Sequence, residues 1–513
     1  MRSFFALGFT LLVVGSAAGA PPEPAKLAAR IDAHVDARLK AENATPAPRT
    51  DDTEFLRRAY LDLTGRTPAP HDVHEFLADQ DPDKRAKLID DLLDSPRYAT
   101  HFAAVWRAAL LPEVAADAQA RVFQPGFEGW LRLKFRANTP YDKFVRELLT
   151  APISADPSAP EAVLRDPTKP NALAFFAVKD ARPENLAAAT ARVFLGVQIE
   201  CAQCHDHPFG RWERDQFWQT AAFFAGVERQ GDDVFAPVSD ARRREITIPN
   251  TKRTLYATFL DGNAPKWAGD TNPRVVLADW VTAKGNPFFA KATANRIWGH
   301  LFGRGIVDPV DDFSEANKPS HPELLDDLAS ALGAADFDLK FLIRAACRTK
   351  AYQRTSAKTH ASQDDPRLFA RMAVKGMTGE QLFDSLALAT GHREGGRDTA
   401  RDRFLTQFAL RGAATEPETS ITQALALMNG RFLNLVTSAE GGPTLVAVRE
   451  TPGMTTPDRI NALYLASLGR KPTAKELDRM TKFVAAGGTD RQAERLSDVF
   501  WVLLNSAEFR LNH

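Results

Sequence analysis

The sequence predicts a mainly α protein in which two helical domains are joined by a small β-containing segment. Apolar residues recur at helical spacing along most of the chain, and a stretch near its start is repeated near its end. Alternation typical of strands is confined to residues 245–257. We therefore divide the 513 residues into a signal peptide (1–20), a helical domain (21–226), a linker with short strands (227–270) and a second helical domain (271–513).

Caps, prolines and glycines mark where the predicted helices begin and end. Asp51 with Glu54 three positions later is typical of a capping box, Gly65 of a helix end, and Pro70 of a first helical turn. The expected helices cover 25–39, the stretch between Asp51 and Gly65, Pro70 to Leu77, Pro82 to Leu93, Pro96 to Leu110, 127–149 in two segments around Pro140, 185–195, 288–301, 323–332, 339–347, 366–372, 379–389, 421–435 and a final helical unit over 457–513. Residues 245–248 and 254–257 are the expected strand pair.

The two ends of the chain carry the same pattern. Tyr60 to Pro68 matches Tyr464 to Pro472 without a gap, and Leu92 to Tyr98 is echoed by Leu503 to Phe509. Glycine suits a left-handed helix end, and a proline shortly after it bars continuation of the helix. We predict one helical unit used twice, with Gly65 and Gly469 in equivalent turns. The alternative is that capping rules alone generate similar strings.

The N-terminus is typical of a secretory signal peptide. Arg2 supplies the positive charge, Phe4 to Val14 is an apolar run too short to span a bilayer, and small residues follow from Gly15 to Ala20. Cleavage after Ala18 or Ala20 leaves no membrane span, so we expect a periplasmic or extracellular protein; the alternative is an uncleaved anchor.

The chain is balanced in charge, with 65 Lys and Arg residues and 65 Asp and Glu residues. This balance argues against a nucleic-acid partner.

Cys201, Cys204 and His205 form a C-x-x-C-H sequence, the attachment signature of a c-type haem. The two thiols can form thioethers with the two vinyl groups, and the imidazole can then bind the iron as proximal ligand. We therefore expect haem c, with a sixth ligand that is unknown: His300, His321 and the methionines are candidates. The aromatic residues that follow suit either a haem wall or plain core: Phe209, Trp212, Phe217, Trp218, Phe223 and Phe224.

Other uses of the motif stay open. Cys201 and Cys204 could hold zinc or iron together with His205 or His207, although no second pair of ligands is visible in the sequence. They could also form a disulfide, as exported cysteines often do. We expect Cys347 to be a buried structural thiol.

The hydrolase motifs G-x-S-x-G and H-E-x-x-H are absent from the sequence, so catalytic residues are unassigned. The expected function is electron transfer or support of a redox partner, another exported protein. The alternative is a secreted binding or scaffold protein.

The segment from Cys201 to Phe209 resembles the hallmark of the planctomycete secreted cytochrome-associated proteins, which join PSCyt and PSD domains of unknown function. Phe55 to Arg66 resembles the opening of the first domain, which makes 21–226 PSCyt-like. Four segments resemble the second domain and make 271–513 PSD-like: Asn295 to Val307, Asp311 to Phe313, Ser320 to Leu325 and Leu504 to Phe509. The chain departs from some relatives, which carry a cytochrome c domain in front or an acidic residue at the place of Gly210. The resemblance implies export and a cytochrome-like motif, and no particular reaction.

Overall fold

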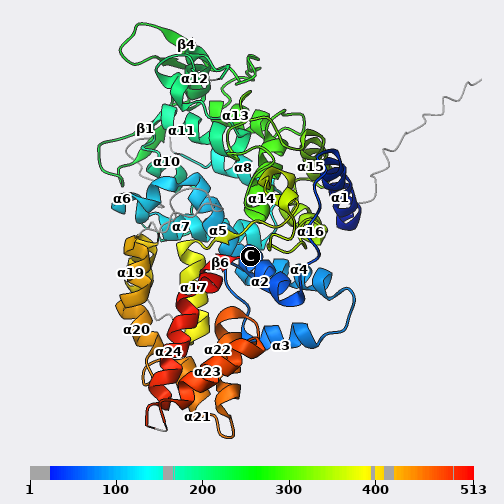
Figure 1. The fold of residues 1–513 in the computed structure, drawn as a ribbon. Helices are drawn as coiled ribbons and strands as arrows, with labels where there is room; N and C mark the ends of the chain where they lie inside the picture. The colour runs from blue at the N-terminus through cyan, green and yellow to red at the C-terminus, as the bar shows by residue number, and fades with distance from the viewer. Residues whose placement is uncertain are drawn as a thin grey trace, which may run out of the picture.

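The computed structural model describes residues 23–153, 166, 168–208, 210–393, 399–408, 421–488 and 490–513. The expected signal peptide and Phe209 lie outside these residues. Helices dominate the fold, and the strands of the described chain form only small two-stranded sheets (Figure 1). The predicted mainly α class is confirmed.

The first part of the chain contains α1 (Pro24–Ala41), α2 (Asp52–Thr64), α3 (Pro70–Ala78), α4 (Lys84–Asp94), α5 (Pro96–Leu110), α6 (Ala118–Arg121), α7 (Gln124–Arg136), α8 (Tyr141–Leu149), α10 (Ala174–Val178), α11 (Pro183–Thr190), α12 (Arg214–Ala221), β1 (Val227–Arg229), β2 (Val238–Asp240), β3 (Glu245–Thr247) and β4 (Thr254–Tyr256). The remainder contains α13 (Pro273–Val281), α14 (Phe289–Phe302), α15 (Pro322–Ala334), α16 (Leu339–Arg348), β5 (Lys375–Gly376), α17 (Gly379–Thr390), α18 (Thr399–Gln407), α19 (Ile421–Asn429), α20 (Arg431–Thr437), α21 (Pro443–Glu450), α22 (Thr456–Leu468), α23 (Ala474–Ala485), α24 (Gln492–Asn505), α25 (Ala507–Arg510) and β6 (Leu511–Asn512).

All three sheets are antiparallel pairs. β1 pairs with β2, and the predicted strand pair appears as β3 and β4, with Ile246 opposite Leu255. β5 pairs with β6, so Lys375 lies opposite Asn512 near the end of the chain. This last pair brings the C-terminus beside α2 (Figure 1).

Three helix predictions were wrong in detail. Residues 366–372 form only a 3-10 turn, because Phe369 adopts a left-handed backbone with φ +51°. The helix predicted over 421–435 is interrupted at Gly430, whose extended backbone separates α19 from α20. The capping box is incomplete: Asp51 accepts the backbone N–H of Glu54, but the Glu54 carboxylate binds Arg58 at 2.6 Å.

The internal repeat is confirmed. α2 and α22 end in left-handed glycines of nearly equal conformation, with φ/ψ of 73°/15° at Gly65 and 70°/18° at Gly469. α3 and α23 then begin at equivalent positions, five residues after each glycine. Ser95 and Ser506 each end one helix and cap the next with their side-chain oxygens. Helix, turn and cap therefore agree between the two units.

The two units pack against each other in a reciprocal way. A large hydrophobic cluster contains buried residues from Leu27 to Met372, and a smaller one those from Met377 to Phe509. Leu61 on α2 belongs to the smaller cluster, and Leu465, its equivalent on α22, belongs to the larger. Each unit thus contributes the same leucine to the core of the other.

The larger cluster includes residues on both sides of the expected linker, such as Phe223 and Leu277, and Leu260 within it. The larger hydrophobic cluster is therefore continuous across residues 227–270, and the predicted domain division at this segment stays a prediction.

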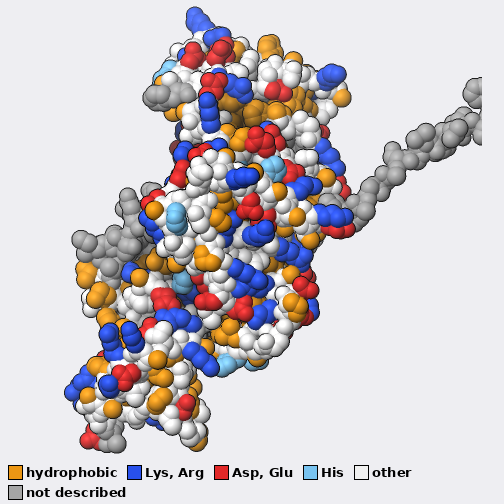
Figure 2. Space-filling model, turned by 45° about the vertical axis from the view of Figure 1, so that its right-hand side comes forward, with side chains coloured by type: hydrophobic (Ala, Val, Ile, Leu, Met, Phe, Trp, Pro, Cys, Tyr) orange, Lys and Arg blue, Asp and Glu red, His pale blue; other side chains and the backbone are white. Residues whose placement is uncertain are grey.

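On the surface, Lys and Arg are interspersed with Asp and Glu over the face in Figure 2. Along the described segments, we find no helix with the length and hydrophobicity needed to traverse a bilayer.

Candidate functional site

The motif begins where the backbone turns sharply after α11. The chain continues from α11 as a π-helical turn, Ala191–Leu195, which ends at Gly196 with φ +69°. A Cβ at this glycine would lie 2.7 Å from the Phe313 ring, so both conformation and space require glycine. The chain then enters a 3-10 helix, Glu200–Gln203, that carries the first cysteine and ends at the second.

Backbone and side-chain contacts hold this turn against the core. Ala202 is fully buried, and its N–H donates to the carbonyl of Ile199 at 2.9 Å. The Trp218 indole N–H, from α12, donates to the Gln203 carbonyl at 3.0 Å. The Asp206 carboxylate accepts the backbone N–H of Arg214 at 2.9 Å, which ties the motif to the start of α12. Three contacts with the core and with α12 therefore hold the motif in place.

Cys201 and Cys204 both lie on the outside of the anchored turn. Both are free thiols with exposed side chains. Ala202, which lies between them, is fully buried, so the turn packs on the core through this residue and leaves the two cysteines exposed. This arrangement leaves both sulfur atoms accessible to a reagent or cofactor.

The His205 imidazole is exposed and oriented by the backbone. Its Nδ1 lies 2.8 Å from the carbonyl oxygen of Asp206. A carbonyl oxygen can only accept, so Nδ1 carries the proton and donates, and Nε2 of the neutral ring keeps its lone pair. Histidines that bind metals commonly donate their second nitrogen to a carbonyl in this way. The ring therefore offers Nε2 as a ligand.

His207 lies in a different environment from His205. Its side chain is half-buried, and its backbone N–H donates to the Trp212 carbonyl at 2.8 Å. A Cβ at Gly210 would lie 3.1 Å from His207 Nδ1, so the glycine lets the chain pass close to this ring. With a side chain at this position, the imidazole would have to shift by a few tenths of an ångström.

The donor set suits a haem better than a metal ion held by the protein alone. Across the residues that the structure describes, no three His, Cys, Asp or Glu side chains gather into a group that could hold a metal ion. A structural zinc ion needs about four protein ligands. A haem needs fewer, because its porphyrin supplies four nitrogens and the protein supplies only axial ligands. Two accessible thiols and one oriented imidazole fit that requirement.

The aromatic residues after the motif form core rather than an exposed wall. All five that the structure describes are buried in the larger hydrophobic cluster: Trp212, Phe217, Trp218, Phe223 and Phe224. Phe209 lies outside the described residues. These aromatic residues therefore belong to the core beside the motif, and Trp218 binds the motif through its hydrogen bond to the Gln203 carbonyl.

The two histidines considered as sixth ligands lie in other parts of the fold, His300 half-buried and His321 buried. His300, on α14, donates from Nε2 to the Asp62 carbonyl at 2.9 Å and packs against the ring of His101. His321, before α15, is buried against Phe369. Burial lowers the pKa of both rings, to about 4 for His321. Neither is placed beside the motif, and the sixth ligand stays unassigned.

Sequence reasoning missed a buried charged cluster around Asp62 on α2. One carboxylate oxygen accepts from Lys375 Nζ at 2.5 Å and from the Asn512 amide at 2.7 Å, and the other accepts from the Tyr352 hydroxyl at 2.8 Å. The cluster joins α2 to β5 and β6. The available signal was the internal repeat, which sets Asp62 against Ala466.

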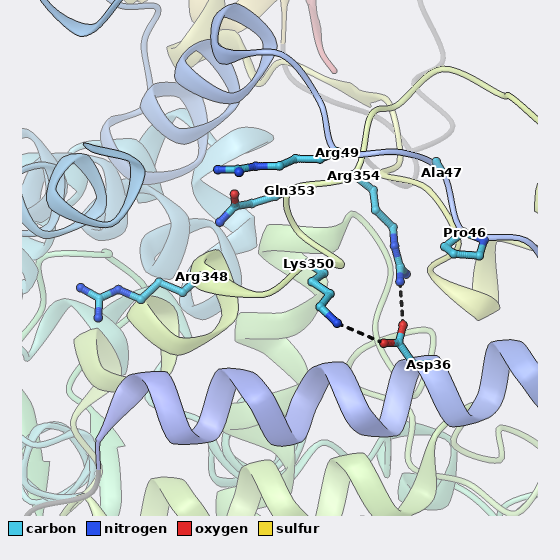
Figure 3. Close-up of a pocket in the computed structure, with 8 residues that line it drawn as sticks. All are labelled: Asp36, Pro46, Ala47, Arg49, Arg348, Lys350, Gln353 and Arg354. Atoms are coloured by element: carbon cyan, nitrogen blue, oxygen red, sulfur yellow. Dashed lines mark hydrogen bonds and ion pairs between the residues drawn. The ribbon is translucent and has the colours of Figure 1, made fainter. Parts of the chain in front are cut away.

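A basic hollow of about 550 Å³ lies between α1 and the loop that follows α16 (Figure 3). Asp36, on α1, pairs with Arg354 at 3.0 Å and lies 3.7 Å from Lys350. Arg348 pairs with Asp90 at 2.7 Å. Since nearby carboxylates bind most of its cations, this hollow is largely neutralised from within. Figure 1 shows α1 well separated from α12, the helix that follows the motif.

Two protein families match separate parts of the chain. Residues 30–229, which include the motif, match the PSCyt2 family, described as a protein of unknown function (DUF1549). Residues 273–407 match the PSD1 family, described as a protein of unknown function (DUF1553). No curated protein and no solved structure matches the chain. The chain thus belongs to the proteins that combine a PSCyt2 domain with a PSD1 domain, both of unknown function.

Proposed function

We propose that this protein is exported and carries one haem c, bound through Cys201 and Cys204 with His205 as axial ligand, and that it transfers electrons to a redox partner. One observation carries the proposal: the Nδ1–H of His205 is held by the Asp206 carbonyl at 2.8 Å, beside two exposed thiols. The apolar run at the N-terminus supports export, which brings the chain to a compartment where such attachment takes place.

The attachment chemistry balances without an added oxidant. Each thiol adds across one vinyl group: its sulfur bonds to one carbon, and a proton goes to the other. Both thiols must therefore be reduced, and a Cys201–Cys204 disulfide would block the reaction. When bound, the haem iron supplies a one-electron couple.

The residues around the motif have definite roles in this proposal. Buried Ala202 and the hydrogen bond from Trp218 keep the 3-10 helix on the surface of the core. The hydrogen bond from His205 Nδ1 fixes the ring orientation and raises the basicity of Nε2. The protein thus presents the thiols and the axial nitrogen from one short segment.

The test is expression of the full chain, with its own N-terminus, in a host that matures c-type cytochromes. The exported protein should stain for covalent haem after denaturing electrophoresis, and its intact mass should lack the first 18 to 20 residues. Cys201→Ala combined with Cys204→Ala should abolish the stain, and His205→Ala should keep the stain but change the visible spectrum. Cys347→Ala is the matched control, because this thiol is fully buried on α16.

A colourless protein with zinc or iron in elemental analysis would contradict haem attachment and favour the metal alternative. A colourless protein without either, in which Cys201 and Cys204 are disulfide-bonded, would favour a binding or scaffold role. A mature protein that retains Met1 would contradict signal cleavage.

A further inference from the structure

The segment that leads into the motif is held by residues from the second half of the chain. Gly196 ends the π-helical turn, and its carbonyl accepts the backbone N–H of Phe313 at 2.8 Å. The Phe313 ring and Ala292, on α14, fill the space beside this glycine, at 2.7 and 3.1 Å from where a Cβ would lie. The Gln198 side-chain amide donates to the Asp311 carboxylate at 3.2 Å. The first cysteine of the motif follows three residues after Gln198, so these contacts lie close to it along the chain.

The loop that makes these contacts, residues 307–313, is itself fixed to α14. Asn295, a fully buried residue of α14, donates from its amide to the carbonyls of Val307 at 2.8 Å and Val310 at 3.2 Å. Its side-chain oxygen accepts the backbone N–H of Val307 at 3.0 Å. A Cβ at Gly305 would lie 2.1 Å from the Val307 carbonyl oxygen, so the turn into the loop leaves no room for a side chain. The loop therefore has a fixed position relative to α14.

The π-helical turn before Gly196 is contacted from α14 as well. The Arg296 guanidinium donates from Nη2 to the carbonyls of Arg192 and Val193, both at 3.4 Å, which is long for a hydrogen bond. A cation is favoured at such a helix end, where carbonyl groups are exposed. The Arg192 side chain in turn pairs with Glu200, the first residue of the 3-10 helix. Residues of α14 and its loop thus contact the chain on both sides of Gly196.

These contacts cross between the two family matches. The motif and the segment before it lie in the PSCyt2 match, residues 30–229, whereas α14 and the loop lie in the PSD1 match, residues 273–407. Within the PSCyt2 match, α12 binds Gln203 and Asp206. Gly196 and Gln198, before the first cysteine, are bound from the PSD1 match. The two domains therefore hold opposite ends of the same short segment.

We propose that Asp311 and Phe313 are positioning residues for the C-x-x-C-H motif, so that the PSD1 domain fixes the orientation in which the PSCyt2 domain presents its two thiols and the His205 ring. A single 3-10 turn makes few hydrogen bonds of its own, so contacts from outside determine where it lies. The consequence for haem rests on the proposed function: a segment held in one position gives the iron one axial geometry.

The first test compares amide hydrogen exchange in the reduced full chain, expressed without haem-maturation factors, and in its variants. Gln198→Ala and Asp311→Ala each remove the side-chain hydrogen bond. Each should speed exchange of the Val197 and Ala202 amides, which are hydrogen-bonded in this segment, about fivefold, as expected for one lost hydrogen bond. Phe313→Ala removes the ring contact and should also speed exchange. Asp311→Asn keeps an oxygen that can accept from Gln198 and should restore the wild-type rate.

Asn138→Ala is the matched control. The Asn138 amide donates to the Asp338 carboxylate at 3.0 Å, also across the two family matches, but it lies between α7 and α8. Because Asn138 has φ +46°, which alanine adopts less readily, this variant should lower Tm. It should leave exchange at Val197 and Ala202 unchanged, which separates general stability from order in the motif.

The second test expresses the same variants in a host that matures c-type cytochromes. Asp311→Ala and Phe313→Ala should carry less haem per chain than the wild type, and their visible spectra should differ from it. Asp311→Asn and Asn138→Ala should match the wild type in both respects. A purely structural role would lower Tm without this change in spectrum and without rescue by asparagine.

Three exchange results would overturn the proposal: unchanged rates in Asp311→Ala and Phe313→Ala, an equal acceleration in Asn138→Ala, and no recovery in Asp311→Asn. A wild-type protein without haem would contradict the proposed function, and the exchange rates would still decide the positioning role. If the wild type carries haem and Asp311→Ala and Phe313→Ala match it in haem content and spectrum, the haem stands and the positioning role is refuted.

Discussion

Replacement of Asp62 by Asn should destabilise the protein strongly, because Asp62 is the only carboxylate among the described residues that pairs with Lys375. The side chains of both residues are almost completely buried, at 2% and 7% exposure. Without the carboxylate, Lys375 Nζ keeps only the carbonyl oxygens of His300 and Leu301. The asparagine amide would also turn donor atoms toward the Tyr352 hydroxyl or the Asn512 amide.

The expected loss follows from the burial of the pair. Removal of one partner from a buried ion pair costs about 3–5 kcal/mol, because the other charge stays buried without compensation. With a urea m-value of about 3 kcal/mol/M, this loss lowers the unfolding midpoint by roughly 1–2 M. Replacement of both charges should cost less than the sum of the single replacements, with a coupling of about 0.5–3 kcal/mol.

The assay is urea unfolding at pH 7, followed by circular dichroism, of Asp62→Asn, Lys375→Met and the double variant. The double variant should be more stable than Asp62→Asn alone, since it no longer buries an unpaired ammonium. Asp336→Asn is the surface control: its pair with Lys284 is exposed, and its loss should not change the midpoint measurably. A midpoint for Asp62→Asn equal to that of the wild type, or a double variant no more stable than Asp62→Asn, would refute this reasoning.

Two further predictions concern a turn and a buried histidine. Gly65→Ala should cost more than Gly469→Ala: both glycines have positive φ, which costs about 1–2 kcal/mol for alanine, but only at Gly65 would the added Cβ lie 2.5 Å from the His101 ring. Equal losses in thermal unfolding would contradict the steric argument. His321 should make the fold acid-sensitive, because burial lowers its pKa to about 4, so the unfolded chain binds a proton that the folded chain does not. The stability it contributes is complete above about pH 6.5 and is lost progressively toward pH 4, by about 3 kcal/mol in total. His321→Gln should flatten this slope in unfolding measured across pH, and an unchanged slope would show that other groups cause it.

The sequence alone determined the features that depend on neighbours along the chain. The helix ends at Gly65 and Gly469, the start of α2 at Asp51 and the β3–β4 pair involve contacts within a few residues, so short patterns predict them. The ungapped match between the two ends likewise predicted the repeated unit. The three residues of the C-x-x-C-H motif are contiguous and were found for the same reason.

Only the tertiary structure decided which side chains face one another across long separations. Asp62 and Lys375 are 313 residues apart, and the Arg57 side chain donates to the Phe509 carbonyl from 452 residues away. No local pattern encodes such pairs, because they arise when helices from distant parts of the chain pack together. Phe369, whose left-handed backbone ends a predicted helix, likewise packs within the larger hydrophobic cluster.

The candidate site shows the same difference between what the sequence predicts and what only the structure adds. The sequence predicted Cys201, Cys204 and His205 as site residues. The structure added the burial of Ala202, the hydrogen bond from Trp218 and the hydrogen bond from His205 Nδ1. The sequence also contained Asp62 in place of Ala466, yet this difference had no meaning until the structure showed Lys375, Tyr352 and Asn512 bound to the Asp62 carboxylate. A substitution between repeats becomes informative only when its partner is known, and folding determines that partner by bringing distant side chains within a few ångströms of each other.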